Sequence, residues 1–161
     1  MARDPFATAR LIALAAPALL LGGALLSQYV GGLYPCEMCY WQRWPHAAAI
    51  VLAIFAILLR RTSFGRLLTA LAAAAILVSG AIGVFHAGVE YHWWEGLTRC
   101  ATSAGASGGD VLATIWATPL IRCDQAQWTL GGISLAGYNA LFSIGAAIAI
   151  FILLGRKGAP R

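Results

Sequence analysis

Two cysteines separated by two residues, Cys36 and Cys39, stand at the beginning of an apolar stretch of the chain. A Cys-x-x-Cys pair forms and breaks a disulfide readily, because its two sulfurs can approach to bonding distance. Two further cysteines, Cys100 and Cys123, lie in a long polar segment, and the chain has 4 cysteines in all. We therefore interpret the four cysteines as two redox pairs and treat all of them as candidate catalytic residues.

A cation stands close to the first pair, since Arg43 follows Cys39 by one helical turn. Residues at that spacing share one face of a helix. If the helix begins between Cys36 and Cys39, its N-terminal dipole favours a thiolate on both sulfurs. Arg43 could stabilise such a thiolate or hold an oxygen of an electron-poor ring. The alternative is that it only anchors the helix at the lipid headgroups.

The composition indicates a membrane protein, because 60% of the residues are hydrophobic and only 11% are charged, against roughly a quarter charged in soluble domains. A spanning helix needs about 20 apolar residues. The stretches that reach or approach this length are 11–29, 40–59, 67–87 and 135–154. The sequence thus predicts an all-α integral membrane protein, a four-helix bundle forming a single domain over 1–161, with outer loops at 30–39 and 88–134.

The charged residues predict how this bundle is oriented. Most basic residues fall on one side of the four spans: Arg3, Arg10, Arg60, Arg61, Arg66, Arg156, Lys157 and Arg161. Most acidic residues fall on the other: Glu37, Glu90, Glu95, Asp110 and Asp124. By the positive-inside rule both termini are cytoplasmic, and the cysteine-bearing loops face the compartment in which disulfides persist. The same distribution explains the net charge of +5 without nucleic-acid binding.

The second outer loop contains a candidate surface helix. Asp110 can cap a run in which Val111, Leu112, Ile115 and Trp116 share one face before a proline. A short helix with one apolar face is expected to lie in the membrane interface.

The run Pro-Cys-Glu-Met-Cys-Tyr-Trp-Gln-Arg, residues 35–43, resembles the disulfide bond formation protein B (DsbB) family of bacterial inner membranes. The segments 86–90 and 123–128 resemble the same family, and the resemblance covers nearly the whole chain. It implies a multi-pass enzyme of the bacterial inner membrane that reoxidises a periplasmic thioredoxin-fold (DsbA-like) thiol oxidase. The resemblance also implies that the electrons pass to ubiquinone or menaquinone in the membrane.

The resemblance also implies a role for each cysteine. Cys100 would form the mixed disulfide with the soluble partner, and electrons would reach the first pair through a disulfide between Cys36 and Cys123. Cys39 would then be the thiolate that faces the quinone, which Arg43 would bind.

His86 lies near the outward end of the third stretch, at about the depth of Arg43, and Glu90 follows one turn later. Reduction of a quinone takes up two protons, which His86 or Glu90 could relay, so His86 is a second candidate for the quinone site. The alternative is a histidine hydrogen-bonded between helices.

Three other interpretations remain open. A vitamin K epoxide reductase-like enzyme also has a four-helix bundle and two cysteine pairs, but its Cys-x-x-Cys lies near the end of a late span, whereas here it opens the second. A non-enzymatic membrane protein with two structural disulfides belongs to another class. A metal site has weak support, because no second closely spaced ligand pair accompanies the Cys-x-x-Cys. No metal is therefore predicted.

Overall fold

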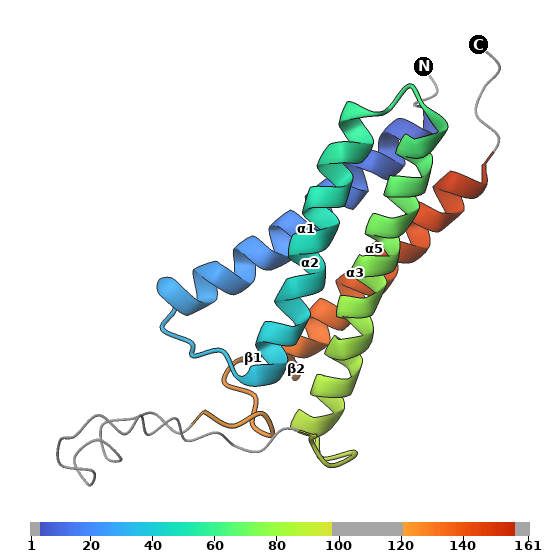
Figure 1. Ribbon diagram of the computed structural model, residues 1–161. Coiled ribbons are helices and arrows are strands. Elements are labelled where there is room, and N and C mark those ends of the chain that lie inside the picture. The colour runs from blue at the N-terminus through green and yellow to red at the C-terminus, as the bar shows by residue number, and fades with distance from the viewer. Residues whose placement is uncertain (1–3, 98–120, 157–161) are drawn as a thin grey trace, which may run out of the picture.

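The computed structural model describes residues 4–97 and 121–156. Its main elements are four long helices (Figure 1): α1 (Pro5–Tyr29), α2 (Glu37–Leu58), α3 (Ser63–Glu90) and α5 (Leu135–Gly155). All 4 are long and apolar enough to cross a membrane. The predicted all-α bundle of four spans is therefore confirmed.

Polar caps extend the helices beyond the predicted apolar stretches. α1 begins at Pro5 rather than at residue 11, because Asp4 caps it with its side chain. Thr62 caps α3 in the same way, its hydroxyl accepting a hydrogen bond from the Gly65 amide at 3.3 Å. Capping groups satisfy backbone N–H groups that the first turn leaves without partners, so the helix ends depend on them as well as on hydropathy.

The half of the bundle nearest the termini is packed through small side chains. Its buried cluster, called the alanine core below, consists of Ala9, Ala13, Ala49, Ala53, Ala72, Ala73, Ile76, Ala147 and Ile150. Further along α3, a Cβ added to Gly80 would lie 2.9 Å from Ile144, and one added to Gly83 would lie 3.0 Å from the Ala136 carbonyl. In lipid the hydrophobic effect does not drive helices together, and association depends on close packing, which small residues allow. The glycines of α3 therefore let α3 and α5 pack tightly.

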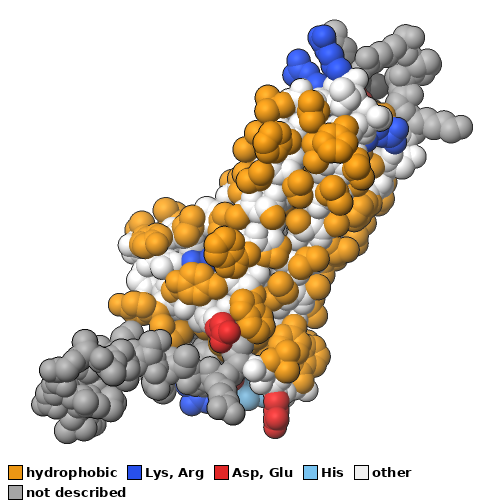
Figure 2. All heavy atoms as spheres, viewed as in Figure 1, with side chains coloured by type: hydrophobic (Ala, Val, Ile, Leu, Met, Phe, Trp, Pro, Cys, Tyr) orange, Lys and Arg blue, Asp and Glu red, His pale blue; other side chains and the backbone are white. Residues whose placement is uncertain are grey.

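The outer surface of the helices is apolar. Figure 2 shows hydrophobic side chains over most of the visible face, with most of the visible Lys and Arg side chains at the end where the termini lie. Leu19 on α1 is 76% exposed and Leu58 on α2 is 70% exposed. Such a surface suits contact with lipid, and which side of the membrane each end faces remains a prediction.

A small hairpin closes the opposite end of the bundle, which we call the cysteine end. β1 (Thr129–Leu130) pairs antiparallel with β2 (Ile133–Ser134), and both residues of the connecting turn, Gly131 and Gly132, have positive φ. The Tyr91 hydroxyl fixes the hairpin to the end of α3, donating to the Gly132 carbonyl at 2.9 Å and accepting from the Ser134 amide at 3.0 Å. The sequence did not predict this hairpin, and the predicted surface helix lies outside the described residues.

Candidate functional site

The first cysteine pair lies at the beginning of α2, which starts at Glu37 rather than at residue 40. Cys36 is the N-cap residue and Cys39 lies in the first turn, with the Cys36 thiol donating to the Cys39 sulfur at 3.3 Å. Cys123 joins them from another segment: it packs against the buried cluster that contains Cys36 and hydrogen-bonds to the Cys36 side chain. Three of the four predicted catalytic cysteines are therefore adjacent, whereas Cys100 lies outside the described residues.

The two sulfurs of the first pair are not equivalent. Hydrogen bonding to Cys123 and to Cys39, together with burial, raises the pKa of the Cys36 thiol. These contacts oppose the thiolate that the helix dipole is expected to favour on Cys36. Cys36 is the hydrogen donor of the pair and Cys39 is the acceptor.

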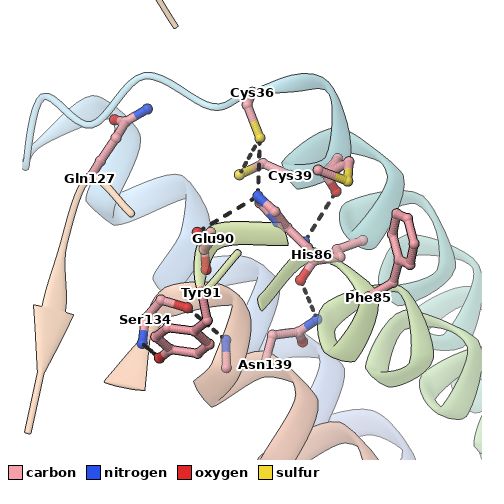
Figure 3. A network of polar contacts seen from close by, with 12 residues as sticks. Cys36, Cys39, Phe85, His86, Glu90, Tyr91, Gln127, Ser134 and Asn139 are labelled. Atoms are coloured by element: carbon pink, nitrogen blue, oxygen red, sulfur yellow. Dashed lines mark hydrogen bonds and ion pairs between the residues drawn. The ribbon is translucent and has the colours of Figure 1, made fainter. Parts of the chain in front are cut away.

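His86 connects the sulfurs to the interior of the bundle (Figure 3). Its side chain is buried in α3, with Nε2 lying 3.5 Å from Cys36 Sγ and 3.7 Å from Glu90 Oε1. On the other side of the ring, Nδ1 lies 2.8 Å from Nε2 of Gln42 in α2. His86 therefore makes the interhelical hydrogen bond weighed as an alternative and also contacts Cys36.

A group of hydrogen-bonded side chains, which we call the polar layer, lies beneath His86 and consists of Gln42, His46, Ser79, Asn139 and Ser143. Asn139 of α5 donates to Gln42 Oε1 at 2.8 Å, and its own oxygen lies 2.8 Å from His46 Nε2. Ser143 donates to the same Asn139 oxygen at 2.9 Å. Ser79 of α3 donates to the backbone carbonyl of Gln42 at 2.8 Å. The polar layer therefore ties α2, α3 and α5 together.

Sequence reasoning missed most of the polar layer. In the sequence analysis Gln42 appears only as part of the cysteine motif, and His46 does not appear. The available signal was the presence of a glutamine and a histidine one turn apart inside an apolar span, where polar groups need partners.

Arg43 points toward α1 instead of toward the surface. Its Nη1 donates to Gln28 Oε1 at 2.5 Å and its Nη2 donates to the Ala24 carbonyl at 3.2 Å. The guanidinium also lies over the Tyr40 ring, 5.2 Å from its centroid. These contacts hold the cation at the wall of a cavity and argue against a role as a simple headgroup anchor.

That cavity has a volume of about 260 Å³ and lies between α1, α2, α3, α5 and the segment 122–128. Its walls bring together Cys36, Cys39, Arg43, His46, His86, Glu90, Trp128 and the leucines of α1. Leu19 is part of the wall and is also 76% exposed, so the cavity extends to the outer surface of the bundle.

Three buried polar atoms of the described residues have no hydrogen-bond partner, and all belong to side chains that line this cavity: Arg43 Nε, His46 Nδ1 and Glu90 Oε2. Apolar walls with a few convergent polar groups are typical of small-molecule sites. The cavity is therefore a candidate site for a small molecule.

The site also contains a group of metal-type ligands, since one atom each from Cys36, Cys39 and His86 lie within 4.8 Å of one another. The sequence could not indicate this group, because His86 is far from the cysteines along the chain. The predicted absence of a metal remains a prediction.

Comparisons with known proteins agree with the motifs. The family model described as "Disulfide bond formation protein DsbB" matches residues 7–153. A disulfide bond formation protein B of Polaromonas sp. is 30% identical over 164 residues, covering 94% of this chain and 91% of the relative. Another, of Marinobacter nauticus, is 26% identical over 152 residues, covering 88% of each chain.

An uncharacterized protein of Rickettsia prowazekii is 22% identical over 156 residues, covering 94% of this chain and 90% of the relative. No solved structure gives a significant match to the chain.

Proposed function

Since this chain belongs to the DsbB family of membrane disulfide bond formation proteins, we propose that it is a quinone-dependent oxidoreductase that generates disulfides de novo. Its soluble substrate is a periplasmic thioredoxin-fold dithiol oxidase, and its electron acceptor is ubiquinone or menaquinone of the bacterial inner membrane. Both termini are then cytoplasmic, and the cysteine end faces the periplasm.

One observation carries the proposal: Cys36 and Cys39 form part of the wall of a cavity that extends to the apolar outer surface. A dithiol in that position can be reached by a lipid-soluble oxidant from the membrane. Cys123 touches Cys36, so the same dithiol can be reached from the segment that follows α3. Electrons can therefore enter through one sulfur of the pair and leave through the other.

The path of electrons starts at the loop pair. The partner's dithiol attacks a disulfide between Cys100 and Cys123 through Cys100, and the partner leaves oxidised while both loop cysteines are reduced. The Cys123 thiolate then attacks Cys36 of the Cys36–Cys39 disulfide. A bond forms between Cys36 and Cys123, and Cys39 is released as a thiolate that carries the electron pair. Attack by Cys100 on Cys123 restores the loop disulfide and frees Cys36.

A quinone in the cavity supplies the oxidising power, accepting two electrons and two protons. The side chains around the cavity would bind the quinone and orient it. Arg43 offers a guanidinium held by α1, and the leucines of α1 form an apolar wall. Glu90, whose Oε2 has no partner among the described residues, is placed to carry a proton between the cavity and the cysteine end.

The test uses the full chain purified in detergent, with ubiquinone or menaquinone and a reduced thioredoxin-fold dithiol, while quinone absorbance is followed. We expect catalytic loss of quinone that disappears in Cys39→Ser. Absence of turnover with either quinone, together with four cysteines that resist mild dithiols, would instead support the alternative of structural disulfides.

A second test separates the loop cysteines. In Cys123→Ser, Cys100 should still trap the soluble partner as a stable mixed disulfide, visible on a non-reducing gel. Failure to trap in this variant, with trapping in Cys100→Ser, would reverse the assigned roles of the two cysteines.

A further inference from the structure

The side-chain amide of Gln42 links His86 to Asn139 of the polar layer. Gln42 is 6% exposed. Its Nε2 lies 2.8 Å from His86 Nδ1 and 3.1 Å from the Met38 carbonyl oxygen, and its Oε1 accepts from Asn139 Nδ2 at 2.8 Å. Both ends of the amide are therefore engaged inside an apolar bundle.

Backbone carbonyls determine which end of each amide is the nitrogen. A carbonyl oxygen only accepts hydrogen bonds, so the Gln42 atom beside the Met38 carbonyl must be the NH2 group. The same reasoning fixes Asn139, whose Nδ2 lies 3.2 Å from the Ser79 carbonyl. With that orientation, the Asn139 NH2 group is the donor to Gln42 and the Gln42 Oε1 atom is the acceptor.

The orientation of the Gln42 amide determines which ring nitrogen of His86 carries the hydrogen. Because Gln42 presents N–H to Nδ1, this ring nitrogen must accept, and the hydrogen of the neutral imidazole resides on Nε2. Nε2 is the nitrogen that lies 3.5 Å from Cys36 Sγ. We propose that Gln42, held by Asn139, is a positioning residue that fixes His86 as the Nε2–H tautomer and so directs a hydrogen-bond donor at the Cys36 sulfur. Its catalytic meaning rests on the proposed function.

This donor acts when the Cys36 sulfur is released from a disulfide. Cleavage of the Cys36–Cys123 bond leaves an electron pair on the Cys36 sulfur, and the Nε2–H group stabilises that charge by a hydrogen bond without transferring its proton. The charged or titratable groups around the ring are Cys36, Cys39, Cys123 and Glu90.

The same arrangement works against capture of a metal by the sulfurs. A histidine that ligates a metal through Nε2 carries its hydrogen on Nδ1 and donates it to an acceptor. Here Nδ1 faces the Gln42 NH2 group, which is a donor. Cys36, Cys39 and His86 are close enough to share an ion, but the neighbour of His86 favours the tautomer that has no free electron pair at Nε2.

The tautomer can be read directly from the ring-nitrogen NMR shifts of protein labelled with ¹⁵N-histidine in detergent micelles. The chain has 3 histidines, and the His86 signals are those missing in His86→Phe. In the unmodified protein we expect a pyridine-type shift for Nδ1 and a pyrrole-type shift for Nε2. In Gln42→Glu the carboxylate accepts from the ring, so Nδ1 should become protonated.

Ser143→Ala is the matched control, because Ser143 belongs to the polar layer but contacts Asn139 through the oxygen that does not face Gln42. Its His86 spectrum should equal that of the unmodified protein. If Gln42→Glu does not fold, Gln42→Leu, which removes the N–H donor that faces His86 Nδ1, should give a mixture of tautomers.

A hydrogen on Nδ1 in the unmodified protein would overturn the proposal. A spectrum unchanged by Gln42→Glu, or by Gln42→Leu where that variant replaces it, would also overturn the proposal. Gln42→Glu should also lower kcat for quinone reduction by about tenfold or more, as loss of an orienting partner does for other reactive histidines. Absence of turnover in the unmodified protein would contradict the proposed function alone, and the NMR shifts would still decide the tautomer.

Discussion

In the half of the bundle near the termini, the helices meet through the alanine core. In the half near the cysteines, the same helices surround a cavity of about 260 Å³ and a layer of hydrogen-bonded side chains. Close contact between small residues stabilises helices in lipid, whereas a cavity gives up contacts and leaves buried polar groups that need partners. The first half is thus close-packed, whereas the second contains the proposed reaction site, so changes in the two halves should have separable effects.

The largest effect expected in the cysteine half is loss of chemistry without loss of fold. Cys36→Ser should abolish quinone reduction, because the sulfur that accepts Cys123 is gone, while the helical circular dichroism and the thermal midpoint stay close to those of the unmodified protein. Turnover that survives this substitution would break the assignment of the redox pair to this half.

In the alanine core the expected effect is on stability. Ala53 is fully buried, and Ala53→Leu should lower the free energy of unfolding by about 1–3 kcal/mol through overpacking. Thermal unfolding in detergent measures it. Ala48, exposed on the same helix, provides the control: Ala48→Leu should change stability little, and equal losses in the two variants would contradict the role given to the core.

Arg43 should affect quinone binding more than the rate of the bound complex. Removing a hydrogen bond from a charged group costs about 1.5–3 kcal/mol, so Arg43→Ala should raise the KM for quinone about tenfold or more. The matched control is Arg60→Ala, at an exposed position beyond the end of α2. An unchanged KM in Arg43→Ala would remove the guanidinium from the proposed ring site.

The smallest effect is expected from the ion pair between Arg122 and Asp124, which is partly exposed in the cysteine half. The Arg122 guanidinium holds the pKa of Asp124 below its ordinary value, through hydrogen bonds to both carboxylate oxygens. A lowered pKa in the folded state favours folding above the unfolded pKa, and this contribution is lost as pH falls through the folded pKa. Arg122→Gln should raise the Asp124 pKa in an NMR titration, and an unchanged pKa would show that the pair is too solvated to matter.

The spans were predictable because hydropathy acts locally along each helix. Cys36, Cys39 and Arg43 were predictable for a similar reason, since one helical turn relates them. The cap at Asp4, which moves the start of α1, shows the limit of hydropathy for helix ends.

What could not be predicted depends on contacts between distant segments. The raised pKa of Cys36 requires Cys123 beside it, and the role of Gln42 requires both His86 and Asn139. Periodicity places each of these residues on a helix or loop, but it does not say which faces meet.

Trp128, 41% exposed, forms part of the cavity wall, and its ring lies 6.3 Å from that of Tyr138. An indole in van der Waals contact with an electron-poor aromatic molecule loses fluorescence by electron transfer in its excited state. The fluorescence of Trp128 can therefore report whether the cavity is occupied, even in a variant whose cysteines have been replaced.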